Sequence, residues 1–224
     1  MNGILLIDKP SGWTSFDVVA KVRGIIRRET GVQKIKVGHT GTLDPLATGL
    51  LVLVVGSYTK RVPELSKADK TYEVTMMIGQ TSTTGDEEGE KTVVSGVRLS
   101  DEEVKKALSL FVGEIKQIPP AHSAIKVNGQ RAYKLARAGK EVIIEPRKVT
   151  IYGITDVAYK HPFVKFTTKV SSGTYIRTLV EDIGKSLGTG AYMTELRRTS
   201  VGKFDLASSQ NLEDIQAIHL IDVQ

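Results

Sequence analysis

The chain has 224 residues, of which 40% are hydrophobic, and it carries a formal net charge of +6 with a pI near 9.4. This length suffices for one large domain or two small ones, and no stretch approaches the length of a membrane span. The absence of cysteine excludes disulfides and thiolate metal sites and fits a reducing cytoplasm, and the N-terminus lacks the pattern of a signal peptide. The positive charge favours a polyanionic partner such as RNA, although a basic protein without such a partner has the same composition.

The first forty residues predict two short strands and one helix. Residues Ile4 to Ile7 form an apolar run typical of a buried strand, and a polar turn from Asp8 to Ser15 leads to a helix N-cap at Thr14 or Ser15. Gly31 is expected to end this helix, and Lys34 to Val37 to form a second strand. The apolar face of the helix is predicted to contain Phe16, Val19, Val22 and Ile26.

A loop of small residues, from Gly38 to Leu50 (GHTGTLDPLATGL), carries a single acid, Asp44. No Lys or Arg occurs between Gly38 and Tyr58, and a buried strand is predicted to follow from Leu50 to Val55. Pro45 favours an extended backbone at Asp44. A lone carboxylate beside a buried sheet needs a partner from elsewhere or a chemical task, although a plain Asp-Pro turn is the common alternative.

The middle of the chain predicts a short helix from Thr59 to Leu65, a strand from Lys70 to Gly79, and a helix that begins with the capping box at Ser100 and ends at Gly113. In the strand, alternate residues point to one apolar face, and these are Tyr72, Val74, Met76 and Ile78. The acids between Thr83 and Lys91 lack the spacing of a calcium loop, so we expect a solvated loop there.

A basic segment follows. From Lys126 to Lys148 there are seven basic residues and two acids, a net charge of +5 that leaves only +1 for the rest of the chain. Asn128-Gly129 predicts a tight turn, and Arg131 to Ala138 a short helix. Such a concentration of charge is typical of phosphate binding, with a solvated basic face as the alternative. The candidate phosphate contacts are Lys126, Arg131, Lys134 and Arg137.

The last third predicts a hairpin from strands Val149–Val157 and Phe163–Val170, a helix that starts after Ser171, and a short helix from Asn211 to Leu220. Arg177 lies in the first turn of the earlier helix, where the dipole disfavours a cation, so a carboxylate is expected to hold it. Glu181, four residues on, offers a surface ion pair as the alternative. The four histidines are too scattered for a sequence-local metal site.

Five of these strings resemble, in the correct order, the motifs of the TruB family, the bacterial tRNA pseudouridine-55 synthases. The strings are Asp8–Ser15, Gly38–Leu50, Lys70–Glu73, Ser171–Gly184 and Ala191–Phe204, and the resemblance covers nearly the whole chain. It implies an α/β (α+β) fold with a mixed, largely antiparallel central sheet flanked by helices. Residues 1–224 would form the catalytic domain, with the RNA-binding insertion at 119–147 gripping the tRNA T-arm. The C-terminal PUA domain of most bacterial members is not expected in this sequence.

The resemblance also implies roles for individual residues. Asp44 falls on the nucleophilic aspartate, and Arg177 on the arginine that pairs with it, with Tyr175 nearby. Tyr72 would lie against the target base and remove its C5 proton, and Leu196 would line the uracil pocket; an ordinary core position is the alternative for both. His39 would stack where the flipped base left a gap, or brace its loop. His122 stands where the family often has an aromatic residue, so stacking there is in doubt.

The function implied is isomerisation of uridine 55 to pseudouridine in the T-arm of tRNA, by a cytoplasmic monomer that uses no cofactor and no metal. A non-catalytic RNA-binding module that keeps the fold is the first alternative, but the set of Asp44, Tyr72, Arg177 and Leu196 argues against it. A nucleotide hydrolase that uses Asp44 is the second, and no phosphate-binding loop supports it.

Overall fold

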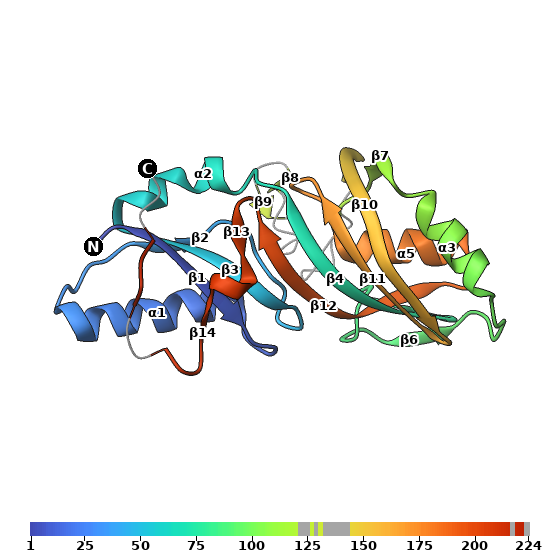
Figure 1. Ribbon diagram of the computed structural model, residues 1–224, viewed down its shortest axis with the longest axis horizontal. Helices are drawn as coiled ribbons and strands as arrows, with labels where there is room; N and C mark the ends of the chain where they lie inside the picture. The colour runs from blue at the N-terminus through green and yellow to red at the C-terminus, as the bar shows by residue number, and fades with distance from the viewer. Residues whose placement is uncertain (121–125, 128–129, 132–143, 216–217, 222–224) are drawn as a thin grey trace. The chain divides into compact units, whose positions relative to one another are not determined.

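The computed structural model describes residues 1–120, 126–127, 130–131, 144–215 and 218–221 (Figure 1). The chain divides into two compact units, the first formed by Met1–Glu73 with Glu195–Gln224 and the second by Val74–Thr194. Two neighbouring strands, β4 (Lys70–Ile78) and β12 (Ala191–Val201), contribute residues to both units. The fold is mixed α and β with a mostly antiparallel sheet, as the sequence predicts.

The first unit is organised around β3 (Thr48–Val55), whose apolar run is buried from Gly49 onwards. It pairs antiparallel with β1 (Gly3–Lys9) and with β2 (Val37–His39), and parallel with β12. At the far side of β1, β14 (Gln210–Asn211) pairs in parallel, and β13 (Phe204–Asp205) forms a hairpin with β12. A strand buried on both faces needs a covering layer on each side.

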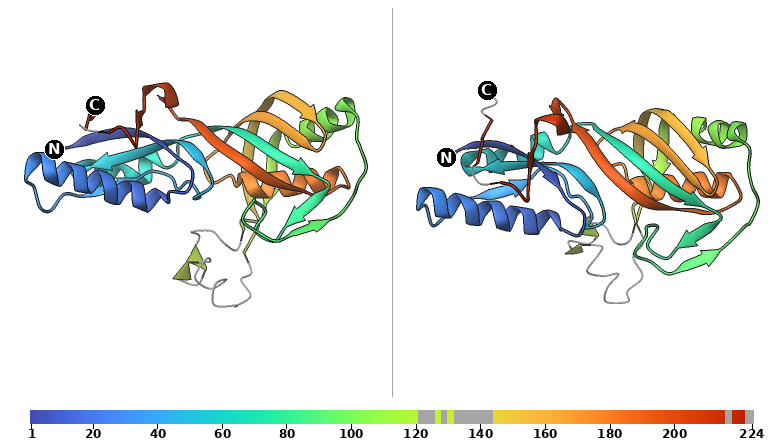
Figure 2. Two further views of the ribbon diagram at one scale, coloured as in Figure 1. Left: turned by 90° about the horizontal axis from the view of Figure 1, so that it is seen from below. Right: turned by 60° about the horizontal axis from the view of Figure 1, so that its bottom comes forward.

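Helical segments provide these two layers. Helix α1 (Ser15–Thr30) lies along one face of β1 and β3, and the 3-10 helix η1 (Gly56–Arg61) with α2 (Val62–Leu65) lies on the other side (Figures 1 and 2). Side chains of η1 and α2 pack against a core cluster made by Ile4, Leu6, Leu50, Val52, Val54 and Val201. The alternate residues of β1 and β3 therefore face α1.

The boundaries of α1 follow from its sequence. Thr14 is the N-cap and forms a capping box with Asp17, and Gly31 closes the helix in the left-handed conformation with φ of 71°. Its buried residues are Ser15, Val18, Val19, Val22, Ile25 and Ile26. Phe16 is 66% exposed, so its predicted place on the apolar face is wrong. Val19, Val22 and Ile26 are buried as predicted, but the buried face is centred towards Ser15 and Val18, so Phe16 lies beyond its edge.

The second unit orders β12, β4, β11 (Phe163–Val170), β10 (Arg147–Lys160) and β7 (Gly113–Gln117) side by side. The predicted β10–β11 hairpin is confirmed, and Tyr72, Val74, Met76 and Ile78 of β4 are all buried as the alternation predicts. Helix α5 (Ile176–Ser186) and helix α3 (Asp101–Ser109), with its capping box at Ser100, complete the unit. Strands β5 (Gln80–Ser82) and β6 (Lys91–Val93) form a separate short hairpin.

Three predicted elements differ from the structure. The strand expected at Lys34–Val37 begins only at Val37, because the residues that pair with β3 are Val37 to His39. The helix expected at Asn211–Leu220 is absent from the described residues of that range. Asn211 instead closes a turn with Glu213 and Asp214, and Ile221 bridges to Ile4 of β1. The loop after Thr83 is not fully solvated, since Asp86 is only 5% exposed.

Little of the basic insertion is described. Strands β8 (Lys126–Val127) and β9 (Gln130–Arg131) pair antiparallel. The predicted turn residues Asn128 and Gly129, His122, and the predicted helix with Lys134 and Arg137 lie outside the described residues, as do the side chains of Lys126 and Arg131. Among the described residues, no helix is long and apolar enough to span a membrane, and no cluster of three or more His, Asp or Glu side chains is suited to a metal ion.

Candidate active site

The loop that carries Asp44 is held through its backbone by the turn that precedes α1. The hydroxyl of Ser15, 3% exposed, donates to the carbonyl of Leu43 at 3.0 Å and accepts from its N–H at 2.8 Å. On the other side of Asp44, the N–H of Gly12 donates to Pro45 O at 2.9 Å, and Ser11 Oγ donates to Leu46 O at 3.3 Å. The residues on both sides of Asp44 are therefore fixed to one turn.

Two buried cations brace the same loop. Lys9 has no exposed surface, and its Nζ donates to the carbonyls of Pro45, Trp13 and Pro10 at 3.1, 2.7 and 2.9 Å. Arg198, 1% exposed, donates from Nη2 to Gly41 O at 3.0 Å and from Nε to Leu50 O at 2.8 Å. One guanidinium therefore spans the beginning and the end of the loop, and both side chains hold carbonyls.

Gly49 shows why the loop ends where it does. It lies opposite Arg198 in the parallel register of β3 and β12, with φ of 96°. A Cβ at this position would lie 2.3 Å from Arg198 O and 2.8 Å from Arg198 N. The close approach of the two backbones therefore excludes every side chain larger than hydrogen.

The electrostatics of this region are set by burial and by its cations. Burial lowers the pKa of Lys9 to about 8, with Asp44 opposing and Arg198 adding to the shift. Burial likewise lowers the pKa of Lys70 to about 8, again with a contribution from Arg198. The pKa of His39 is lowered by burial and then by Arg198, which favours the neutral imidazole. Asp44 and His39 thus lie in positively charged surroundings.

Three further predicted site residues lie in the first unit. His39 ends β2 and is partly buried, and its Nδ1 has no hydrogen-bond partner among the described residues. Tyr72, 7% exposed, and Leu196, 9% exposed, lie on the neighbouring strands β4 and β12, which Ser200 Oγ and Thr71 Oγ1 connect at 2.9 Å. The first unit therefore carries Asp44, His39, Tyr72 and Leu196. Their predicted roles toward a pyrimidine stay predictions.

Arg177 lies in the second unit, and a carboxylate holds it there, as its place in the first turn of α5 predicts. Its Nη1 contacts Asp86 Oδ2 at 3.3 Å and donates to Thr84 O at 3.2 Å. Both side chains of the ion pair are buried, with 11% of Arg177 and 6% of Asp86 exposed. The ion pair that the structure gives Arg177 is thus a buried one with Asp86, whereas the alternative was a surface pair with Glu181. The pairing of Arg177 with Asp44, which belongs to the other unit, stays a prediction.

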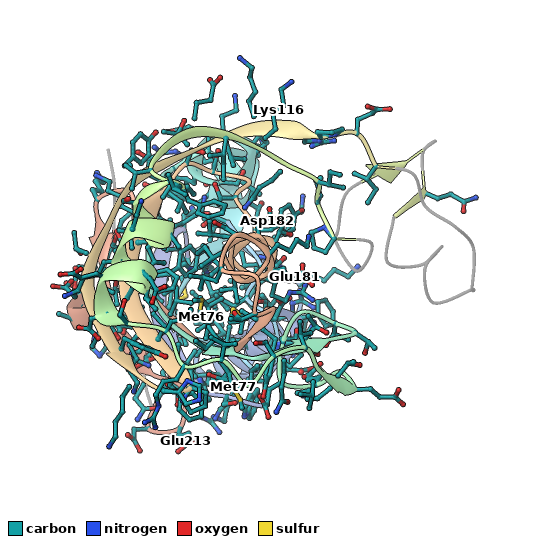
Figure 3. All side chains as sticks on the ribbon, turned by 90° about the vertical axis from the view of Figure 1, so that its right-hand side faces the viewer. Met76, Met77, Lys116, Glu181, Asp182 and Glu213 are labelled. Atoms are coloured by element: carbon teal, nitrogen blue, oxygen red, sulfur yellow. The ribbon has the colours of Figure 1, made fainter. Side chains whose placement is uncertain are left out.

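The loop around Asp86 is itself rigidly built. Oδ1 of Asp86 accepts from Thr84 Oγ1 and from the N–H of Glu88. Glu181 of α5 lies beside Gly85 of this loop, and Figure 3 shows Glu181 and Asp182 on different sides of α5. Burial raises the pKa of Glu181, and Arg177 partly opposes this shift.

Tyr175 is the N-cap residue of α5, and its backbone is held from both sides. Its N–H donates to Gln117 Oε1 at 3.0 Å, and its carbonyl accepts from Gln117 Nε2 at 3.2 Å. Gln117 is 1% exposed, so this pair of hydrogen bonds fixes the start of α5 next to Arg177.

Sequence reasoning did not find Arg198, Asp86 or Gln117. A signal existed for Arg198, because Arg197 and Arg198 are consecutive in a strand, where one of two neighbours must face inward. The signal for Asp86 was the missing partner of Arg177, but its loop also holds Glu87, Glu88 and Glu90, and only the fold selects one. Gln117, one amide at the end of a short strand, gave no signal.

The family is decided by comparison with known proteins. Residues 27–176 match the family model described as TruB family pseudouridylate synthase (N terminal domain), and residues 177–223 match the tRNA pseudouridylate synthase B C-terminal domain. The chain belongs to the TruB family of pseudouridylate synthases. The chain is 48% identical over 219 residues to tRNA pseudouridine synthase B of Pseudomonas fluorescens, and the match covers 98% of this chain and 70% of that protein. It is 46% identical to the enzyme of the same name from Dechloromonas aromatica, at 97% and 71% coverage.

Solved structures of the same fold agree with this family assignment. A chain in the crystal structure of a Cbf5-Nop10-Gar1 complex superposes with a TM-score of 0.72 at 31% identity, and the match covers 95% of this chain. A chain in a structure of an H/ACA RNP bound to a substrate RNA containing 2′-deoxyuridine superposes with a TM-score of 0.69 at 29% identity. This TruB-family chain spans about half of each of those chains, at 53% and 51%.

Proposed function

We propose that this chain isomerises uridine 55 to pseudouridine in the T-arm of tRNA. The reaction breaks the bond between N1 of uracil and C1′ of the ribose, and forms a bond between C5 and C1′. The proton lost from C5 is balanced by the proton gained at N1, so no oxidant, reductant or external group takes part. Membership of the TruB family and the names of the relatives, tRNA pseudouridine synthase B, support this proposal.

The target uridine must leave its stack before any of this chemistry can begin, because a base inside a folded RNA arm is unreachable. In the proposed reaction, Asp44 acts as an ionised nucleophile and Arg177 supports its charge. Tyr72 removes the C5 proton after the uracil has turned. Leu196 and Tyr175 contact the extruded base, and His39 fills the place that the base has left.

The observation that carries the proposal is the way the Asp44 loop is held. The hydrogen bonds from Ser15, Lys9 and Arg198 end on backbone groups of this loop, on both sides of Asp44. A carboxylate that attacks a sugar carbon must be positioned before the substrate arrives, and a preorganised backbone achieves this. Lys9 and Arg198 also place positive charge beside this loop.

The insertion at 119–147 is proposed to grip the T-arm, with Lys126, Arg131, Lys134 and Arg137 contacting phosphates. The segment from Lys126 to Lys148, which contains most of this insertion, has a net charge of +5. We further propose that residues 1–224 act as one catalytic domain, as a monomer in the cytoplasm.

The deciding experiment maps pseudouridine in an unmodified tRNA transcript after incubation with the wild type, with Asp44→Asn, and with Asp205→Asn. Asp205 is an exposed acid of the same unit and serves as the matched control. We expect pseudouridine at position 55 with the wild type and Asp205→Asn, none with Asp44→Asn, and tRNA binding by all three. Full turnover by Asp44→Asn contradicts the role of Asp44. Binding by the wild type without any pseudouridine would instead indicate a non-catalytic RNA-binding module.

A further inference from the structure

A second basic region lies in the first unit, at the C-terminal end of α1 and in the segment that leads to β2. Between Asp17 and Asp44 the chain has six basic residues and one acid, Glu29. The resulting net charge of +5 equals that of the segment from Lys126 to Lys148. We call Arg23, Arg27, Arg28, Lys34 and Lys36 the α1 corner.

The structure leaves the charges of the α1 corner without carboxylate partners. Among the described residues, none of its five side chains makes an ion pair, and the last four are exposed. Three exposed cations elsewhere, Lys105, Lys148 and Lys185, each pair with an acid. The positive potential of the corner is therefore directed at the solvent.

Helix stability alone does not explain this arrangement. The helix dipole favours Arg27 and Arg28, which lie in the last turn of α1. It has no bearing on Lys34 and Lys36, which follow the helix, and Arg23 and Arg27 are like charges four residues apart, a destabilising spacing. Arg23 donates to Val37 O at 3.4 Å, while its Nε is buried with no hydrogen-bond partner among the described residues. An anion bound at the surface would relieve the repulsion.

The distance between the α1 corner and Asp44 determines which phosphates of a bound RNA can contact the corner. Helix α1 begins at Ser15, which is bonded to Leu43 beside Asp44, and it ends at Thr30 (Figure 1). Sixteen helical residues span about 24 Å, so the corner is roughly that far from the loop where the uridine reacts. A phosphate that contacts the far end of the corner while uridine 55 is at Asp44 therefore lies roughly 24 Å from the reacting uridine.

We propose that the α1 corner binds the phosphate backbone of tRNA outside the T-arm, as a contact separate from the basic insertion. This inference rests on the function proposed above. The binding is sequence-independent, since exposed Arg and Lys side chains contact phosphates and carry no base readout. Its energy comes from the release of counterions, so it weakens as salt is raised.

The test compares two RNAs and two variants. The first variant carries Arg27→Gln, Arg28→Gln, Lys34→Gln and Lys36→Gln, all at exposed positions. The control carries Lys116→Gln, Lys160→Gln, Lys165→Gln and Lys169→Gln, which removes the same charge from exposed positions of β7, β10 and β11. Figure 3 shows Lys116 at the outer edge of the second unit. The dissociation constant of each protein is measured over a range of salt concentrations, for a full tRNA transcript and for a T-arm hairpin.

The corner variant is expected to bind tRNA roughly tenfold more weakly at low salt, with a salt slope reduced by about 3, since each lost phosphate contact lowers it by about 0.7 to 0.9. Its affinity for the hairpin should change less than twofold, and the control variant should bind both RNAs like the wild type. An unchanged affinity for tRNA overturns the proposal. So does an equal loss on the hairpin, or an equal loss in the control. Because binding needs no turnover, a wild type that forms no pseudouridine would overturn the proposed function while leaving this comparison decisive for the corner.

Discussion

The Asp44 loop of the first unit and the Asp86 loop of the second unit each carry an acid near a buried cation, and the described hydrogen bonds of the two loops end on different groups. In the Asp86 loop the carboxylate itself is bonded, with Oδ1 accepting from Thr84 and Glu88, and Oδ2 facing Arg177. In the Asp44 loop the buried cations, Lys9 and Arg198, donate to backbone carbonyls of the flanking residues.

The difference separates a structural acid from a proposed reactive one. Asp86 acts through Arg177, because both of its oxygens are committed to fixed donors. The braces of the Asp44 loop fix its path and add positive charge without using a carboxylate as their acceptor. Neutral substitutions at the charged residues of the two loops should therefore change different properties, the free energy of unfolding for Arg198 and the reaction rate for Asp86.

The largest effect is expected from Arg198→Met. The variant leaves the buried carbonyls of Gly41 and Leu50 without their donors, and we expect a loss of about 3 kcal/mol in the free energy of unfolding. Urea denaturation measures this loss. The control is Arg197→Met on the same strand, whose partly exposed ion pair with Asp8 should contribute less than about 1 kcal/mol. Equal losses in the two variants would contradict the role assigned to Arg198.

The next effect concerns Asp86→Asn, which keeps the shape of the side chain and removes the charge that holds Arg177. We expect the rate of pseudouridine formation under single turnover to fall about thirtyfold, equivalent to about 2 kcal/mol, with tRNA affinity unchanged. Asp182→Asn removes an acid from the surface of α5, where it pairs with Lys185, and should leave the rate as in the wild type. A wild-type rate in Asp86→Asn would show that Arg177 needs no carboxylate there.

A pH effect is expected from the buried lysines of the first unit. In the folded protein the pKa of Lys9 is lowered from 10.5 to about 8, so between these values the unfolded chain binds a proton that the folded chain has lost. The unfolding free energy therefore gains up to about 1.4 kcal/mol per pH unit from Lys9 as pH rises from 8 to 10.5. Lys70 contributes in the same direction. Urea titrations across this range should show a smaller slope for Lys9→Met, and an identical slope would refute the assignment.

The smallest effect compares two helix caps. Thr14 and Ser100 each form a capping box, at α1 and α3, so Thr14→Ala and Ser100→Ala should each lower stability by about 1 kcal/mol. Only Thr14 adjoins Ser15, which holds Leu43 beside Asp44. We therefore expect a rate reduced about twofold in Thr14→Ala alone, measured in the same single-turnover assay. A matching reduction in Ser100→Ala would remove the link between α1 and the loop.

Local patterns predicted much of this fold from sequence. The apolar run of β3, the alternation of β4 and the Thr14 and Gly31 caps depend on residues close in sequence, and the structure has all of them. The helix predicted at Asn211 failed because pairing between Ile221 and Ile4, distant in sequence, decides that segment. Phe16 was misplaced because a step of one residue, from buried Ser15 to Phe16, crosses the edge of the buried face of the helix.

The residues of the candidate site also differ in whether local sequence patterns could predict them. Asp44 was found because thirteen consecutive residues carry a pattern, whereas the partner of Arg177 in its own unit lies 91 residues away in a loop with several other acids. Arg198 reads as one of two exposed charges until the register of β12 on β3 places its backbone against Gly49. Contacts that depend on strand register are invisible to periodicity.

Arg198 has a consequence for how this segment can vary. Its main chain lies against Gly49, and its guanidinium donates to the carbonyls of Gly41 and Leu50. One residue of β12 therefore fixes the distance between the two ends of the loop. Inserting or deleting one residue within that span would break the fit even if every side chain were kept. What the fold holds constant here is the length of the segment.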